Sequence, residues 1–161
     1  KAVMDAGGVA AVVAAMGGHA ADVDLQRNGC GALQNMTLLN MAAGSDACKQ
    51  AVVDAGGASA LVAAMGHHAA DVVVQRAGCG ALQNMASGSN ARKKAVMDAG
   101  GVAAVVAAMG GHAADVQLQR WGCVALQIMA AGSDAYKQAV SDACRKAVVD
   151  AGGAAAVVAA V

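Results

Sequence analysis

The sequence AVMDAGG at residues 95–101 decides the fold, because near copies of it recur along the chain. It is repeated at residues 2–8, 51–57 and 147–153, with valine in place of methionine in the last two copies. The starting residues 2, 51, 95 and 147 lie 49, 44 and 52 residues apart, by subtraction. A period of about 40 to 47 residues is typical of solenoid repeats that contain two or three helices. The sequence therefore predicts an array of helical repeats.

A second motif supports the same period. QRAGCGALQNM at residues 75–85 recurs at residues 26–36 and, in altered form, at residues 119–129. Because the two motifs alternate, they divide the chain into repeating units that cannot each bury an apolar face alone and must stack on their neighbours. The predicted array has three nearly complete units at residues 1–43, 44–87 and 88–131, and a partial unit at residues 132–161.

Each unit contains three predicted helices separated by glycine. In the third unit, the first helix spans residues 89–99, with Ser89 or Asn90 as its N-cap, and stops at the glycine pair 100–101. The second helix, residues 102–109, is apolar on nearly all sides, which is typical of a buried helix. The third begins after Asp115 and runs to Met129. The N-cap aspartates predicted for the equivalent helices are Asp22 and Asp71.

Two insertions explain the two long spacings. Residues 37–41 (TLLNM) end in Asn-Met, as the preceding helix does at residues 35–36. Residues 141–148 (SDACRKAV) are a near copy of the eight residues before them, 133–140 (SDAYKQAV). At 3.6 residues per turn, five extra residues rotate a helix face by about 140°, and eight rotate it by about 80°. Each insertion must therefore lengthen a helix or bulge into a loop.

Composition excludes several classes of protein. Of the 161 residues, 58% are hydrophobic and the net charge is zero, which is the opposite of the signature of disorder. Phe and Pro are absent, and the composition does not favour strands and turns. Neutrality removes the basic field that nucleic-acid binding requires, so we expect no nucleic-acid partner. The longest uncharged runs, residues 6–21 and 99–114, are shorter than a membrane-spanning helix, and we expect no membrane span.

The histidines and cysteines do not form a recognisable catalytic or metal-binding pattern. Histidines precede each third helix at residues 19, 67–68 and 112, and cysteines recur inside these helices at residues 30, 79 and 123. Equivalent residues lie one repeat apart, which is too far for the three or four ligands of one metal ion. We interpret them as surface-loop histidines and small buried cysteines, and expect no enzyme activity, metal or cofactor. Five cysteines, an odd number, indicate reduced thiols and a cytoplasmic location.

The three-helix unit closely resembles the armadillo repeat over essentially the whole chain. The residues that carry the resemblance are the Lys-x-Ala-Val-x-Asp-Ala-Gly-Gly stretch that contains Lys94, ALVAAM at residues 60–65, and GCGALQNMA at residues 78–86. HEAT repeats are the nearest alternative, but they usually have two helices and lack this junction. The resemblance implies an all-α, right-handed superhelix of three-helix repeats, an armadillo-type solenoid. It also implies a concave groove, lined by the third helices, that binds an extended peptide.

In that family an asparagine of the third helix holds the peptide backbone, and a tryptophan one turn earlier forms a side-chain pocket. Asn35 and Asn84 match the asparagine, whereas Ile128 replaces it in the third unit. An amide offers both a donor and an acceptor, as a peptide backbone requires. The tryptophan positions are occupied by Gly31, Gly80 and Val124, which predicts a shallow groove. The alternative is that both asparagines are ordinary solvated helix residues.

Three arginines and one tryptophan complete the candidate binding residues. Arg27, Arg76 and Arg120 occupy equivalent positions on the third helices and would form a ladder of positive charge. Guanidinium groups pair readily with carboxylates, so an extended acidic segment would fit this ladder. The alternative is a solvated face with local aspartate partners. Trp121, beside Arg120, is interpreted either as a packed aromatic at the rim or as a binding anchor.

These patterns predict a non-enzymatic scaffold that binds a protein or an extended peptide. The alternative is a structural subunit of a larger assembly in which the groove is unused, and a transport adaptor like the importin-α family is a more remote one. The chain starts within a helical pattern at Lys1 and ends in a fully apolar run at residues 154–161. We therefore expect a section of a longer array, or ends covered by neighbouring subunits.

Overall fold

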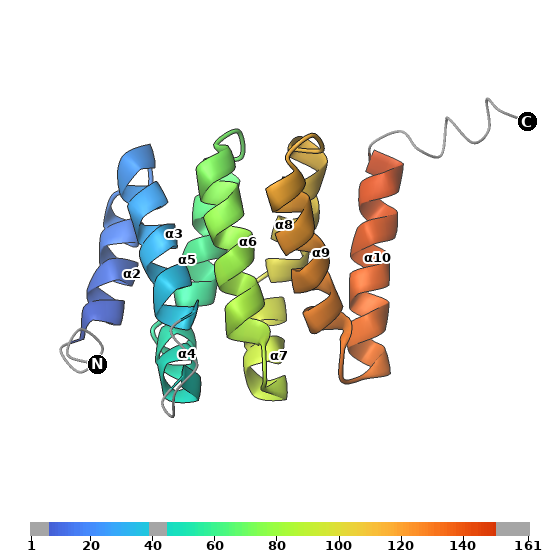
Figure 1. The fold of residues 1–161 in the computed structure, drawn as a ribbon, viewed down its shortest axis with the longest axis horizontal. Helices are drawn as coiled ribbons and strands as arrows, with labels where there is room; N and C mark the ends of the chain where they lie inside the picture. Colours follow the sequence, from blue (N-terminus) through green and yellow to red (C-terminus); the bar gives the residue numbers. More distant parts are fainter. Residues whose placement is uncertain (1–6, 39–44, 151–161) are drawn as a thin grey trace, which may run out of the picture.

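The structure, a computed structural model, describes residues 7–38 and 45–150, without the side chains of residues 45 and 147–150. Within these ranges every regular element is a helix, which confirms the all-α prediction (Figure 1). The helices are α2 (Gly8–Gly18), α3 (Val23–Leu38), α4 (Ser45–Asp54), α5 (Gly57–His67), α6 (Val72–Ala86), α7 (Asn90–Asp98), α8 (Gly101–Gly111), α9 (Val116–Ala130) and α10 (Asp134–Asp150).

The helices follow one another in the predicted order of short, short and long. Helices α4, α5 and α6 form one such series, and α7, α8 and α9 form the next. The long helices α3, α6 and α9 lie side by side, with α5 and α8 behind them (Figure 1). Packing of α3 against α6, and of α6 against α9, is the most extensive between any elements of the described chain. The division at residues 1–43, 44–87, 88–131 and 132–161 stays a prediction.

The glycine pair between α7 and α8 ends one helix and allows the next to start close by. Gly100 has a φ of +87°, in the left-handed region that glycine adopts without strain. At Gly101 a Cβ atom would lie 2.8 Å from the carbonyl oxygen of Val96, so a side chain does not fit. The chain bends by 65° between the two helices. Gly56 and Gly57 repeat both features between α4 and α5, which accounts for the recurrent glycine pair.

The predicted N-caps of the third helices are confirmed. The Asp71 carboxylate accepts hydrogen bonds from the backbone N–H groups of Val73 and Val74, both at 3.0 Å. Asp115 accepts one from Leu118 at 2.8 Å, and Asp22 accepts one from Leu25 at 3.0 Å. Each aspartate thus satisfies backbone donors that lack a partner within the helix.

The prediction that the second helices are buried on all sides is wrong. In α8, Val102, Val105 and Ala108 are buried, whereas Ala103 and Ala107 are exposed. The reason is the layering: α8 packs against α9 on one side and contributes to the outer surface on the other. Alanine on the outer side costs little because its exposed apolar area is small.

Glycines inside the third helices allow close approach of the second helices. At Gly78 a Cβ atom would lie 2.5 Å from Sδ and 2.6 Å from Cγ of Met65, which is itself buried. The same contact recurs in the other units, where Gly29 faces Met16 and Gly122 faces Met109. The methionine therefore fills the space that a larger residue on the third helix would need.

The octet at residues 141–148 lies within α10, a single helix of 17 residues. Of the two predicted outcomes, lengthening of a helix is therefore the one observed. Helix α10 packs against α8 and α9, with Val140 and Ala143 against the core (Figure 1). Its exposed residues include Asp134, Lys137, Gln138, Asp142 and Arg145.

Several sequence predictions fall outside the described residues. In the first insertion, Thr37 and Leu38 continue α3, but residues 39–41 are not described. The start at Lys1 and the apolar run at residues 154–161 also lie outside the described ranges.

Candidate interaction surface

Helices α3, α6 and α9 lie side by side (Figure 1), and we call their exposed sides the third-helix face. Four large hydrophobic side chains are exposed in the described part of the chain, and all four lie on these helices. They are Leu38 (54% exposed), Val73 (47%), Val116 (73%) and Val124 (36%). Val73 and Val116 lie in the first turns of α6 and α9, whereas Leu38 is the last residue of α3, so these side chains share one layer of helices but lie at different heights along it.

Two of the three predicted arginines bind aspartates of the next unit. The Arg27 guanidinium donates from Nε and Nη2 to Oδ2 of Asp71, at 3.0 and 2.5 Å, and from Nη1 to Asp24 at 2.8 Å. Arg76 donates to both carboxylate oxygens of Asp115, from Nε at 3.0 Å and from Nη2. Asp71 and Asp115 are also the N-caps of α6 and α9. Each ion pair therefore links one third helix to the N-terminus of the third helix in the next unit.

The pKa values of these groups follow from the same contacts. The hydrogen bond from the Arg27 guanidinium holds the pKa of Asp71 below its ordinary value, and the Val74 backbone N–H contributes in the same direction. The hydrogen bond from Arg76 likewise lowers the pKa of Asp115. Both carboxylates are thus stabilised in their charged form by the guanidinium groups.

The predicted ladder of three free arginines is therefore mostly occupied. The alternative interpretation, local aspartate partners, describes Arg27 and Arg76. Arg120 is exposed and forms no ion pair with the described residues. Peptide binding by the three arginines stays a prediction, with Arg120 as the most accessible of them.

The predicted backbone-binding residues lie on the third-helix face but differ in exposure. Asn35 is exposed, Asn84 is half-buried, and Ile128 is half-buried in the third unit. Gly80, which occupies a tryptophan position of the family pattern, is covered by the side chain of Gln34 from α3. Trp121 is half-buried and packs against the hydrophobic core. The arrangement favours the packed interpretation of Trp121 over an exposed anchor.

An equivalent glutamine in each third helix was not predicted from the sequence; it is buried in α3 and α6 and half-buried in α9. The Gln75 amide donates from Nε2 to the carbonyl oxygens of Met65 at 2.8 Å and His68 at 3.0 Å. These carbonyls lie at the C-terminal end of α5, where helix acceptors lack partners within the helix. Gln26 and Gln119 make the same contacts. The signal was present, because glutamine precedes the arginine in all three copies.

Two loop histidines connect neighbouring units. Nε2 of His68 lies 2.8 Å from the carbonyl oxygen of Ala20, and Nε2 of His112 lies 2.8 Å from that of Ala69. The interpretation of these histidines as simple surface residues is corrected, because each forms part of the junction between its own unit and the preceding one.

The recurring cysteines have two different environments. Cys30 and Cys79 are fully buried, and burial raises the pKa of both thiols to about 12. Cys123 is exposed, so the prediction of a buried cysteine is wrong at this position. The cause is the absence of a further third helix beside α9 in the described chain. Among the described residues, no group of three or more potential ligands could hold a metal ion.

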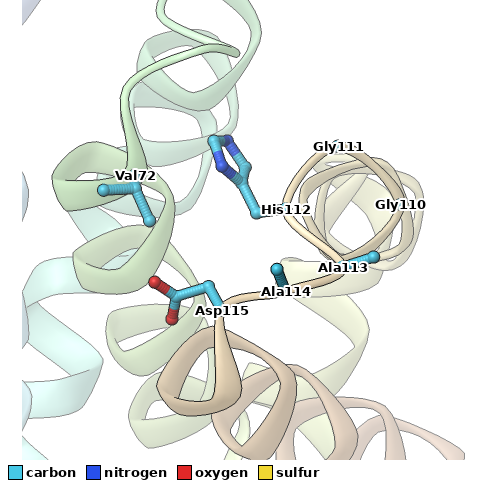
Figure 2. Close-up of a pocket in the computed structure, with 7 residues that line it drawn as sticks. All are labelled: Val72, Gly110, Gly111, His112, Ala113, Ala114 and Asp115. Carbon is cyan, nitrogen blue, oxygen red and sulfur yellow. The ribbon is translucent and has the colours of Figure 1, made fainter.

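The junction between α6 and α9 contains a shallow open pocket of about 580 Å³. The His112 ring and the Asp115 carboxylate project from the loop between α8 and α9 towards α6, where Val72 forms part of the wall (Figure 2). Both polar groups already bind the neighbouring unit, through Ala69 and Arg76 respectively. The pocket is therefore a feature of the junction.

In the described ranges, no individual helix has both the length and the apolar character needed to cross a bilayer, although α7 and α8 together meet these criteria as a bent pair.

Comparison with known proteins found relatives among solved structures. No protein-family model and no curated protein matches the chain. One engineered protein from the Northeast Structural Genomics Consortium is 34% identical, with a TM-score of 0.75 over 89% of this chain, which spans only 32% of that protein. A second engineered protein from the same consortium is 30% identical, with a TM-score of 0.75 over 95% of this chain and 71% of its own. At this identity and coverage, the chain belongs to the same family as the second engineered helical protein.

Proposed function

We propose that the chain is an armadillo-type, right-handed superhelical array whose function is non-enzymatic: it binds an extended peptide segment of another protein on the third-helix face. The observation that carries this proposal is that the large apolar side chains exposed in the described part of the chain all lie on α3, α6 and α9, which are side by side. A face shared by several units suits an extended ligand, because each unit contributes an equivalent set of contacts along its length.

The chemistry of this face indicates what the peptide would contain. Asn35 offers an exposed amide that can both donate to and accept from a peptide backbone. Val73 and Val116 offer apolar contacts for alternate side chains. Because Arg27 and Arg76 are engaged with aspartates, an acidic residue of the ligand would bind Arg120. We therefore propose that the peptide carries apolar side chains and one acidic residue, which lies near α9, and that it is not acidic throughout.

The test is selection from a phage-displayed library of random 12-residue peptides, followed by affinity measurements on the selected sequences. We expect enriched peptides whose binding weakens about tenfold in the double variant Asn35→Ala and Asn84→Ala, since hot-spot residues carry most of the energy of an interface. Asn90→Ala is the matched control, because Asn90 is an exposed asparagine of α7. A library that yields no enriched sequence, or peptides that bind both variants equally, would contradict the proposal.

A structural subunit is the second candidate, and the ion pairs favour it. Arg27 and Arg76, the charged residues best placed to receive a ligand, bind neighbouring units of the same chain. In such a subunit the third-helix face would be unused and the chain would contact its neighbours through other faces, so that the library selection would yield no peptide specific for this face.

A further inference from the structure

The chain at α10 contains the same short sequence twice. Residues 133–140 (SDAYKQAV) and 141–148 (SDACRKAV), which we call the first and the second octet, share five of their eight residues. Both also resemble the sequence of α4 at residues 45–52 (SDACKQAV), which the first octet matches at seven positions and the second at six. In α4 this sequence packs the helix against the core, since Val52 is fully buried. Helix α10 therefore carries two copies of a packing sequence that α4 has once.

The turn that follows α9 selects the first octet in the structure. The Ser133 hydroxyl accepts a hydrogen bond from the Tyr136 backbone N–H at 3.2 Å, as the Ser89 hydroxyl does at the start of α7. The glycines that precede these serines, Gly132 and Gly88, both have positive φ angles, of +120° and +82°. The turn that leads into α7 thus recurs before α10, with Ser133 in the N-cap position.

The spacing of the repeat favours the second octet. In the third unit, Ser89 at the start of the first helix lies 11 residues before Gly100, by subtraction. Ser141 likewise lies 11 residues before Gly152, whereas Ser133 lies 19 residues before it. The difference of eight residues corresponds to about 12 Å along a helix. One helix can therefore satisfy either the turn after α9 or the spacing of the repeat, but it cannot satisfy both.

The first octet is packed less deeply than the equivalent residues of the other units. Val96 of α7 and Val52 of α4 are fully buried, whereas the equivalent Val140 is half-buried. Lys93 is 7% exposed, and the equivalent Lys137 is exposed. Hydrophobic stabilisation scales with the apolar area that is removed from water. Helix α10 therefore loses less stabilisation than α4 or α7 would lose if these residues left their position.

We propose that α10 is a register switch. In the first register, which the structure shows, the first octet packs against α8 and α9 (Figure 1). In the second register, the helix begins at Ser141 and the second octet takes the same position, while residues 133–140 connect it to α9. The switch moves the end of α10 by about 12 Å along the helix axis. Because the two octets make similar contacts, the two packings differ little in free energy, as a bistable element requires.

Hydrogen exchange measured on the complete protein distinguishes this switch from ordinary fraying of the helix. Residues 146–148 are helical in both registers, whereas residues 138–140 are helical only in the first. We therefore expect the amides of residues 138–140 to exchange about tenfold faster than those of residues 146–148. Fraying predicts the opposite order, because residues 146–148 lie nearer to the end of α10 at Asp150. Equal exchange, or faster exchange at residues 146–148, would overturn the proposal.

Proline substitutions at three equivalent, exposed positions test whether the octets can replace each other. Gln138→Pro interrupts the first octet and Lys146→Pro interrupts the second, while Lys94→Pro interrupts α7, which has no second copy of its sequence. We expect each single variant of α10 to retain protection from exchange in the uninterrupted octet. Lys94→Pro should remove the protection of α7, and the double variant Gln138→Pro with Lys146→Pro should remove that of both octets.

A second substitution reports which octet packs against the core. In the Gln138→Pro variant, Val140→Ala should leave the urea midpoint unchanged, whereas Val148→Ala should lower it by about 0.5 M. In the Lys146→Pro variant, the two effects should be exchanged. If Gln138→Pro removes protection from both octets, or if Val140→Ala lowers the midpoint in that variant, α10 has a single register and the proposal is wrong.

Discussion

Gly78→Ala should destabilise the protein, whereas the same substitution at Gly31 should stabilise it. Both glycines lie inside third helices, so both changes gain helix propensity worth about 1 kcal/mol. They differ in what surrounds the new methyl group. At Gly31 a Cβ atom meets nothing within 4 Å, while at Gly78 it would lie 2.5 Å from Sδ and 2.6 Å from Cγ of Met65.

The size of the effect at Gly78 follows from this overlap. Ordinary contacts begin at about 3.4 Å, so Met65 must move by nearly 1 Å. Cγ lies close to the backbone, and Met65 is only 3% exposed, so its side chain cannot simply swing into solvent. Overpacking of this kind costs about 1–3 kcal/mol. After subtraction of the propensity gain, Gly78→Ala should lower the free energy of unfolding by up to about 2 kcal/mol, and Gly31→Ala should raise it by nearly 1 kcal/mol.

Urea denaturation followed by far-ultraviolet circular dichroism measures both changes. With a slope of about 2 kcal/mol per molar urea, the midpoint should fall by up to about 1 M for Gly78→Ala and rise by nearly 0.5 M for Gly31→Ala. The double variant Gly78→Ala with Met65→Ala is the control, because it removes the overlapping atoms. Its loss of stability should be smaller than the sum of the two single losses. If Gly78→Ala is as stabilising as Gly31→Ala, the close approach of α5 and α6 is refuted.

Three further predictions concern the junctions and the thiols. Gln75→Ala should lower the free energy of unfolding by about 2–3 kcal/mol in urea denaturation, because the carbonyls of Met65 and His68 lose their donor. Gln138→Ala on the surface of α10 is the control and should change the free energy of unfolding by less than about 0.5 kcal/mol. The folded-state pKa of Asp71 lies below the ordinary value of 3.8, so the stability that its carboxylate contributes is present above that pH and is lost as the pH falls through the lower value. Asp71→Asn should therefore reduce the loss of unfolding free energy at acid pH. An unchanged loss at acid pH would count against the ion pair. Cys123 should react with iodoacetamide at pH 7 in the folded protein, whereas Cys79, with its pKa raised to about 12, should react only after unfolding, as mass spectrometry would reveal.

Local signals made the helices and their ends predictable. Asp71 and Asp115 satisfy donors of their own helices, and Gly100 adopts a backbone conformation that depends on its own lack of a side chain. Such contacts lie within a few residues of sequence, so the residue types alone indicate them. The period of the repeat also follows directly from the sequence, and with it the side-by-side placement of the units.

Contacts between units were harder to predict. Arg27 binds Asp71, which lies 44 residues away, and recognition of this pair requires the relative rotation of two helices. For the same reason the sequence left open whether the arginines were free or paired. Exposure at the end of the array was also missed: Cys123 has the same local sequence pattern as Cys79 but lacks a neighbouring third helix among the described residues. The eight-residue duplication had two possible outcomes, and the packing of α10 on α8 and α9 decides between them.

The stacking of neighbouring third helices can be tested with one engineered disulfide. An ideal Cβ at Gly80 lies 3.5 Å from Cγ of Gln34, the position that Sγ takes in Gln34→Cys. In a disulfide a Cβ lies about 3 Å from the partner's sulfur, so a small shift allows the bond when Gln34→Cys and Gly80→Cys are combined. We predict that mild oxidation links residues 34 and 80 within one chain, as mass spectrometry can identify, while Gln34→Cys combined with Lys94→Cys on α7 gives no such link. A folded, helical double variant that fails to form the 34–80 bond would contradict the side-by-side arrangement of α3 and α6.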